Sequence, residues 1–225
     1  MRRILPFICI ALISLSGNTQ DFHLSQYNSA PINFNPAMTG MFKGNYRIHG
    51  HYRTQWQAVA TRPFTTGLLS FDMPVPGVKN LAVGAQIANQ NAGQGNYNVF
   101  AFLASAAYDF KLDKGNAHHL SVGIQGGFFQ KSVDPDRLFF QQQYSPMSGG
   151  GFDAALPNGE SFASQSVFQH DLNAGLMYYY AKPSARFNPF IGGAVFHITE
   201  PEETFFSLDN KIPMRFLVHG GSKIN

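Results

Sequence analysis

Hydrophobic and polar residues alternate with a period of two along most of this chain, beginning near residue 45. Between 45 and 56 one set of positions is polar throughout, whereas the other set carries aromatic side chains at its two ends, Tyr46 and Trp56. Because successive side chains of a β-strand point to opposite faces, this pattern predicts a strand with one polar and one apolar face. Aromatic residues that flank an apolar stretch are typical of a strand in contact with lipid.

The same alternation recurs further along the chain, so that about eight strands are predicted in all. The other segments are 64–73, 81–88, 100–110, 119–131, 171–180, 189–197 and 215–224. About ten residues suffice for a tilted strand to cross the apolar layer of an outer membrane. The predicted fold class is therefore all-β, an antiparallel transmembrane β-barrel of the outer-membrane type.

The connections between the predicted strands are unequal in length. Turns are predicted at 74–79 and at 113–116, where Asp113-Lys114-Gly115-Asn116 has the composition of a tight turn. Longer loops are predicted at 90–96, 132–169 and 197–214. Since long and short connections alternate along the chain, the long loops are expected at one end of the barrel, where proteins of this kind carry specificity.

Residues 1–20 have the three parts of a secretory signal peptide: Arg2 and Arg3, about twelve apolar residues, then small and polar residues. The apolar stretch is too short to cross a bilayer as a helix. Cleavage after Ser16 and cleavage near Gln20 both fit the sequence. Cys9, the one cysteine, lies within this leader, so the exported chain is expected to have neither a disulfide nor a thiolate metal site.

The remaining chain divides into two parts. Residues 21–44 contain Pro31 and Pro36, which exclude a membrane strand, and are predicted to form a periplasmic or plug-like segment. Residues 45–225 are predicted to form the barrel.

Composition supports a strand-built membrane protein. Charged residues make up 13% of the chain, about half the usual share for soluble domains, while Phe and Gly are each present 22 times. The net charge of +3 becomes +1 without Arg2 and Arg3, because 14 basic residues then face 13 acidic ones. No nucleic-acid partner is expected from so balanced a charge.

No catalytic, cofactor or metal site is predicted, and we expect the protein not to be an enzyme. The glycines around Gln94 lack the spacing of a phosphate-binding loop. His49 and His51 share one strand face, a geometry open to a metal ion, but the favoured interpretation is that they are polar residues facing the barrel lumen. Asp134 and Asp136 fit a solvated loop, and no serine stands in a nucleophile elbow.

Charged residues of both signs share the inward-facing positions of the predicted strands. They are Arg47, Arg53, Asp72, Asp109, Lys111, Lys131 and Asp171. Two interpretations are open: ion pairs within the barrel, or a pore lined by charges. The mixture of signs favours ion pairs.

Several short motifs resemble the PorP/SprF family. In the first part of the chain they are Gln20-Asp21, Ser25-Gln26-Tyr27, Asn35-Pro36-Ala37, Asn45-Tyr46-Arg47, Tyr52-Arg53 and Gln55-Trp56. The resemblance continues through His119-Leu120-Ser121-x-Gly123-x-Gln125, Asp171-x-Asn173-x-Gly175 and His219-Gly220-Gly221. It covers essentially the whole predicted mature chain.

The resemblance implies an outer-membrane protein of the type IX secretion system of Bacteroidetes. Members of the family help export and hold large surface adhesins, in contact with the periplasmic secretion and gliding machinery. The implied partners are a secreted adhesin cargo, periplasmic type IX components and outer-membrane lipid. We expect partner contact at Asn35, Pro36, Arg53 and Trp56. A general porin for small solutes is the alternative, and an outer-membrane hydrolase is a third class.

The end of the sequence departs from the family pattern. Members continue with further strands after the His-Gly-Gly motif, whereas this chain ends at Asn225 within a predicted strand. A barrel that is incomplete at its C-terminus is therefore expected.

Overall fold

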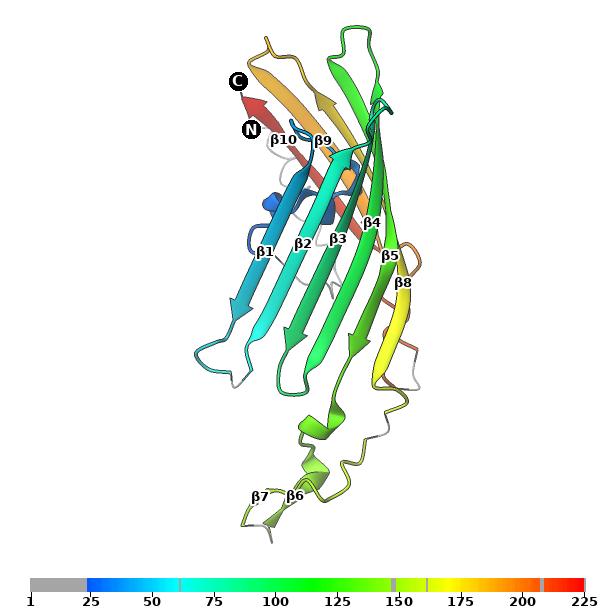
Figure 1. Cartoon of the computed structure of the whole chain (residues 1–225). Helices are drawn as coiled ribbons and strands as arrows, with labels where there is room; N and C mark the ends of the chain where they lie inside the picture. The colour runs from blue at the N-terminus through cyan, green and yellow to red at the C-terminus, as the bar shows by residue number, and fades with distance from the viewer. Residues whose placement is uncertain (1–23, 61, 147–148, 161, 207–208, 225) are drawn as a thin grey trace, which may run out of the picture.

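A computed structural model describes residues 24–60, 62–146, 149–160, 162–206 and 209–224. Its main element is a curled antiparallel sheet of eight strands (Figure 1). The strands are β1 (Arg47–Gln55), β2 (Phe64–Pro74), β3 (Leu81–Ala92), β4 (Tyr97–Lys111), β5 (His118–Ser132), β8 (Ser166–Tyr180), β9 (Phe187–Phe196) and β10 (Arg215–Ile224). The predicted all-β, antiparallel fold class is confirmed. The predicted signal peptide, with Cys9, lies outside the described residues.

Each strand of this sheet pairs with the next one along the chain, in the order β1-β2-β3-β4-β5-β8-β9-β10. Within the described residues, no pairing joins β1 to β10. The sheet therefore has two edge strands and a concave face that its curl partly encloses (Figure 1).

The eight predicted strands all form, but two predicted loops are too long. Residues 166–169, assigned to the loop 132–169, begin β8. Residues 90–92, assigned to a loop, continue β3, and only the turn 93–96 joins β3 to β4. The strand extends because its polar end is held across the sheet: Asn89 Nδ2 donates to Asn98 Oδ1 at 3.3 Å, and Asn91 Nδ2 donates to Asn96 Oδ1 at 3.1 Å. Amide side chains thus replace apolar contacts at the end of this hairpin.

The longest connection, between β5 and β8, carries structure of its own. It contains the 3₁₀ turns η3 (Pro135–Arg137) and η4 (Gln141–Gln143). It also contains the two-stranded hairpin of β6 (Tyr144–Ser145) and β7 (Gly151–Phe152). Figure 1 shows this connection projecting beyond the end of the sheet, on the side where the β1–β2 and β3–β4 connections also lie.

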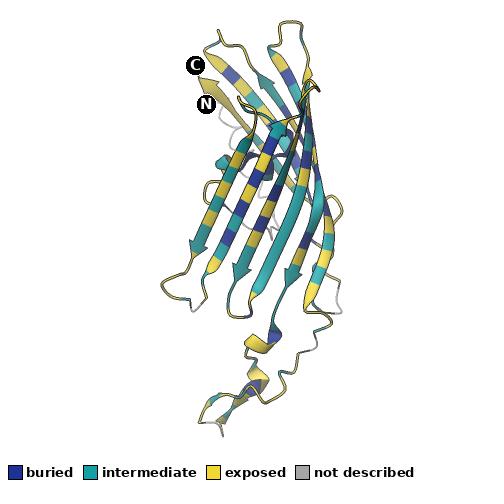
Figure 2. Cartoon of the chain, in the orientation of Figure 1, coloured by how far each residue is buried: buried dark blue, intermediate teal, exposed yellow. Residues whose placement is uncertain are grey.

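The convex face of the sheet is apolar. Figure 2 shows exposed and buried positions alternating along the strands, as a period of two requires. The exposed set on the strands includes Ile48, Leu69, Val83, Ile87, Ile124, Leu172, Leu176, Ile191, Phe216 and Val218. Exposed aromatic residues stand toward both ends: Tyr46, Phe71, Tyr108 and Phe110 near the short turns, and Tyr52, Trp56, Phe64 and Phe168 near the long loops. An apolar belt between two aromatic girdles is typical of a lipid-facing strand surface.

The N-terminal segment, residues 24–44, lies on the concave face. It forms three short turns of helix: η1 (Tyr27–Ser29), α2 (Pro31–Phe34) and η2 (Pro36–Met38). Ala30, Ile32 and Ala37 of this segment are essentially inaccessible to solvent. No helix in the described parts of the chain is long and apolar enough to span a membrane.

Candidate functional site

The concave face of the sheet is polar and largely buried. The buried polar side chains that the strands contribute include Thr66, Ser70, Asp72, Gln86, Ser105, Ser121, Gln125, Asp171 and Asn173. Buried polar groups are stable only when they are hydrogen-bonded, so their partners define what this face is built to hold.

Asn35 anchors the N-terminal segment to the last strands of the sheet. Its side chain is fully buried, and its Oδ1 accepts a hydrogen bond from the Ala37 N–H at 2.9 Å, which caps η2. Its Nδ2 lies 3.2 Å from the Leu176 carbonyl oxygen of β8, 3.4 Å from the Gly193 carbonyl oxygen of β9, and 2.9 Å from Nε2 of His219 on β10. One amide therefore connects the segment to three strands.

Three inward-facing glycines make room for this segment. A Cβ placed on Gly123 of β5 would overlap the backbone of Pro36 and Ala37, and one placed on Gly175 of β8 would overlap Asn35 Oδ1. A Cβ on Gly192 of β9 would overlap the His219 ring. We call the surface formed by these three glycines the seat. A side chain at any of the three positions would occupy space that Asn35, Pro36, Ala37 or His219 now fills.

Hydrogen bonds from the sheet hold η2 in this seat. The Ser121 hydroxyl donates to the Ala37 carbonyl oxygen at 2.7 Å. Thr39 Oγ1 lies 2.8 Å from the Pro36 carbonyl oxygen and 3.0 Å from the Ser105 hydroxyl. The segment is thus fixed by specific polar contacts as well as by burial.

A buried ion pair holds the other end of the segment. Asp72, which is fully buried, accepts hydrogen bonds from Arg47 Nε at 2.9 Å and from Arg47 Nη2 at 2.7 Å. The Gly40 N–H also donates to Asp72 Oδ2 at 2.7 Å, and Arg47 Nη2 donates to the Met38 carbonyl oxygen at 3.0 Å. This bidentate pair therefore joins β1 and β2 to the N-terminal segment.

Other inward-facing charges are paired as well. His119 Nδ1 lies 2.7 Å from Asp109 Oδ2, and His197 Nδ1 lies 3.1 Å from Asp171 Oδ2. Lys131 pairs with Glu203 of the β9–β10 connection. These contacts bear out the ion-pair interpretation for Asp109, Lys131 and Asp171. Lys111, in contrast, is exposed at the end of β4.

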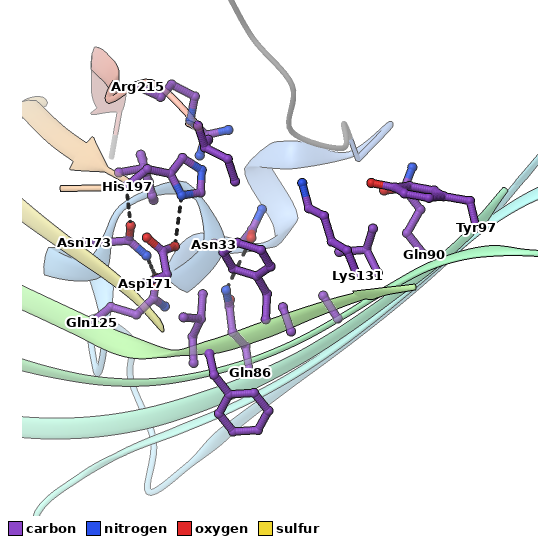
Figure 3. Close-up of a pocket in the computed structure, with 18 residues that line it drawn as sticks. Asn33, Gln86, Gln90, Tyr97, Gln125, Lys131, Asp171, Asn173, His197 and Arg215 are labelled. Atoms are coloured by element: carbon purple, nitrogen blue, oxygen red, sulfur yellow. Dashed lines mark hydrogen bonds and ion pairs between the residues drawn. The ribbon is translucent and has the colours of Figure 1, made fainter. Parts of the chain in front are cut away.

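A cavity of about 200 Å³ lies on the concave face between the seated segment and the long-loop end. Figure 3 shows its polar side chains converging from the N-terminal segment and from β3, β4, β5, β8 and β10. Those side chains are Asn33, Gln86, Gln90, Tyr97, Gln125, Lys131, Asp171, Asn173, His197 and Arg215. Apolar residues line the rest: the aliphatic Ala88, Val99, Ala101, Leu103 and Ile212, and the aromatic Phe128, Phe129 and Phe196.

Hydrogen bonds fix the orientation of the amides in this cavity. The His197 N–H donates to Asn173 Oδ1 at 2.9 Å, and Asn173 Nδ2 donates to Gln125 Oε1 at 3.1 Å (Figure 3). Gln86 Nε2 donates to Asn33 Oδ1 at 3.4 Å. The buried side-chain atoms without a hydrogen-bond partner in the described structure include Gln125 Nε2, Gln86 Oε1 and Asp171 Oδ1 of this cavity.

The four residues predicted to contact partners lie in two separate places. Asn35 and Pro36 are buried in the seat of the N-terminal segment. Arg53 is on the inward side of the edge strand β1, and Trp56 follows β1 at the long-loop end with 65% of its surface exposed. The structure does not bring the two pairs together, and partner contact at these residues stays a prediction.

The histidine pair considered as a metal site lies side by side, with the His49 and His51 ring centroids 6.3 Å apart. Across the described ranges, no group of three or more His, Cys, Asp or Glu side chains has the arrangement of a metal site.

The cavity residues Gln86, Gln125 and Asn173 were not predicted as site residues. Gln125 and Asn173 belong to motifs that resemble the PorP/SprF family, whereas Gln86 shares only its inward-facing position with the other polar residues of its strand. Which of those positions meet depends on the register between strands, here Gln125 opposite Asn173.

The sequence was also compared with known protein families. A family model described as type IX secretion system membrane protein PorP/SprF matches residues 16–225. Neither the curated proteins nor the solved structures gave a match to this chain.

Proposed function

Because the chain belongs to the PorP/SprF family of type IX secretion system membrane proteins, we propose that it is an outer-membrane accessory component of that system. In this proposal it helps to export large surface adhesins, anchors them at the cell surface, and contacts the periplasmic secretion and gliding machinery. Its role is that of a binding partner, without enzymatic activity.

The observation that carries the proposal is the seated N-terminal segment. A general porin, the alternative, needs an open polar lumen through which solutes diffuse. Here the concave face holds a segment whose Asn35 reaches β8, β9 and β10, and whose Gly40 N–H binds the Arg47–Asp72 pair. A lumen filled in this way supports a partner protein over a diffusion channel.

We assign different partners to the two ends of the sheet. Short turns between strands are typical of the periplasmic end of outer-membrane barrels, and longer loops are typical of the outside. We therefore assign cargo contact to the long-loop end, where Trp56 is exposed, and contact with periplasmic components to the end that carries the turn 112–117. Aromatic residues are common anchors of protein interfaces. Trp56 belongs to the girdle at the long-loop end, so in this proposal cargo contacts it at the membrane surface.

Affinity purification tests this proposal. A tagged copy of the full chain is expressed in a bacterium with a type IX system, and proteins that co-purify from its outer membrane are identified by mass spectrometry. We expect a large surface protein together with periplasmic type IX components. A protein that inserts, purifies alone and conducts ions in a planar bilayer would instead establish the porin alternative.

A matched pair of variants tests the assignment of the ends. Trp56 and Tyr46 are equally exposed, at 65%, but lie at opposite ends of β1. Trp56→Ala is expected to lower cargo recovery by about tenfold, the loss typical of an interface anchor. Tyr46→Ala is expected to leave cargo recovery unchanged, and equal losses in both variants would contradict the assignment.

A further inference from the structure

We propose that the cavity on the concave face binds the main chain of an extended polypeptide segment with small, apolar side chains. Gln125 donates to a carbonyl oxygen of that segment, and Gln86 accepts from one of its N–H groups. The proposal rests on the proposed function, because it takes the secreted cargo as the source of the polypeptide.

The first reason is that two glutamines lining the cavity each keep one buried polar atom without a partner. Gln125 Oε1 already accepts from Asn173, which leaves Gln125 Nε2 as a donor without a hydrogen-bond partner. Gln86 Nε2 already donates to Asn33, which leaves Gln86 Oε1 to accept. Both glutamines are more than nine-tenths buried, so leaving these atoms unbonded is unfavourable.

A peptide main chain matches this arrangement. Each peptide unit carries one donor and one acceptor that point in opposite directions, and both need partners once they leave water. Gln86 and Gln125 come from β3 and β5, on either side of β4, so they reach the cavity from two positions across the sheet. Asp171 Oδ1, from β8, supplies a further acceptor for an N–H group.

The apolar part of the cavity wall favours apolar side chains. Ala88, Val99, Ala101, Leu103 and Ile212 are aliphatic, and Phe128, Phe129 and Phe196 are aromatic. Small apolar side chains gain from the same walls.

The charges around the cavity disfavour a charged ligand. Asp171 is paired with His197, and Lys131 is paired with Glu203. Arg215 lies over the Phe196 ring, with its Cζ 4.2 Å from the ring centroid. A ligand with a net charge would have to compete with these pairs, whereas a neutral amide would not.

The size of the cavity sets the length of the bound stretch. A volume of about 200 Å³ equals that of about seven water molecules in the liquid, which is room for about two small residues. The occupant is therefore one short stretch of a longer chain that continues beyond the cavity.

Photo-crosslinking in the intact protein tests the proposal. Tyr97 lines the cavity, whereas Phe100, on the same strand, belongs to the set of positions that faces outward. The photoreactive residue p-benzoylphenylalanine is placed at 97 or at 100 in the tagged chain, in a host with a type IX system, and crosslinked peptides are identified by mass spectrometry. We expect position 97 to capture a stretch of the co-purifying cargo and position 100 to capture none.

A pair of glutamine variants tests the hydrogen bonds themselves. Gln125→Leu removes the donor in the cavity, whereas Gln130→Leu makes the same change on the exposed side of the same strand. Gln125→Leu is expected to lower the crosslink yield at position 97 by about fivefold, the effect of one lost hydrogen bond, at an unchanged amount of inserted protein. Gln130→Leu is expected to leave it unchanged.

The outcomes separate this proposal from the proposed function. If cargo co-purifies but position 97 captures only this chain, lipid or glycan, the cavity proposal is overturned and the proposed function stands.

If no cargo co-purifies, the proposed function fails, and the cavity is tested with purified protein and an acetylated, amidated trialanine peptide. Protection of an Ala88→Cys variant from a thiol reagent by this peptide supports the cavity proposal, and equal labelling with and without it overturns the proposal.

Discussion

At Gly123 the sheet and the N-terminal segment approach so closely that the absence of one methyl group decides whether they fit. The position faces the backbone of Pro36 and Ala37, neither of which is a flexible side chain that could move aside. Glycine is needed at this position because two backbones approach closely, and not because of the backbone angles that glycine can adopt.

Gly123→Ala is expected to destabilise the protein by about 1–3 kcal/mol, the usual cost of overpacking, and to loosen the N-terminal segment. Thermal unfolding in detergent, followed by gel mobility, measures the first effect, and protease cleavage after Lys43 measures the second. Gly126→Ala on the same strand is the control, because its Cβ would meet Leu172 Cδ1 at 3.5 Å, an ordinary contact. Equal effects of the two substitutions would show that the segment does not occupy the seat.

Asp72 is a fully buried charge that is paired with Arg47. Asp72→Ala is expected to cost about 3–5 kcal/mol, because Arg47 would remain in a largely buried site without its carboxylate. Asp134→Ala breaks the exposed Arg137–Asp134 pair and is expected to cost less than about 1 kcal/mol. Urea or thermal unfolding of both variants against the parent measures the difference, and a cost below 1 kcal/mol for Asp72→Ala would contradict a structural role for the pair.

At the scale of single elements, the alternation of residues predicted the strands because the two faces of each strand meet different surroundings. The inward residues meet the N-terminal segment or each other, and the outward residues form the apolar belt. The prediction failed at 166–169, which begin β8, and at 90–92. In the second case Gln90 and Asn91 are polar on opposite faces, so a period of two gives no signal, and cross-strand amide bonds hold the strand.

The partners of inward residues were beyond the reach of that pattern. Asp109 pairs with His119 across the β4–β5 hairpin, and Asn173 meets Gln125 across β5 and β8. Both pairings depend on the stagger between strands, which a period of two leaves undetermined. The seat of Asn35 likewise depends on glycines from three strands that are distant from it in sequence.

The turn between β4 and β5 is an element whose stability depends on pH. Asp113 Oδ1 accepts hydrogen bonds from the backbone N–H groups of His118 and Ala117, each at 2.8 Å. These bonds, with that of His118 the largest cause, hold the pKa of the Asp113 carboxyl below its ordinary value of 3.8. A lowered pKa means that the carboxylate stabilises the fold above pH 3.8, and that this stabilisation is lost as the pH falls through the lowered value.

Asp113→Ala is therefore expected to be less stable than the parent near neutral pH, with the difference shrinking once the pH falls below 3.8. Asp113→Asn keeps the accepting oxygen without a titrating group, so its stability relative to Asp113→Ala should stay constant with pH. Thermal unfolding between pH 3 and pH 7 measures both differences. A gap between parent and Asp113→Ala that is the same at every pH would contradict this account.

At the scale of the whole molecule, the two aromatic girdles define where the sheet meets the membrane surface. The chain contains one tryptophan, Trp56, and the structure places it in the girdle at the long-loop end. Tryptophan in such a girdle lies at the level of the lipid headgroups, where its ring is half in contact with water.

The fluorescence of Trp56 in lipid vesicles reports this depth. Lipids with a spin label near the headgroup are expected to quench it more strongly than lipids labelled near the end of the acyl chain. Trp56→Phe is the control, since it removes the signal and shows that no other residue contributes. Stronger quenching by the deep label would place Trp56 inside the apolar layer and would contradict the assignment of the girdle.

The contacts of Asn35 impose an order on assembly. Its amide reaches partners that are 141, 158 and 184 residues further along the chain, on β8, β9 and β10. Contacts between such distant residues form late, since the intervening chain must be ordered first. We therefore expect the N-terminal segment, the first part of the described chain to be synthesised, to dock only after β8, β9 and β10 have paired.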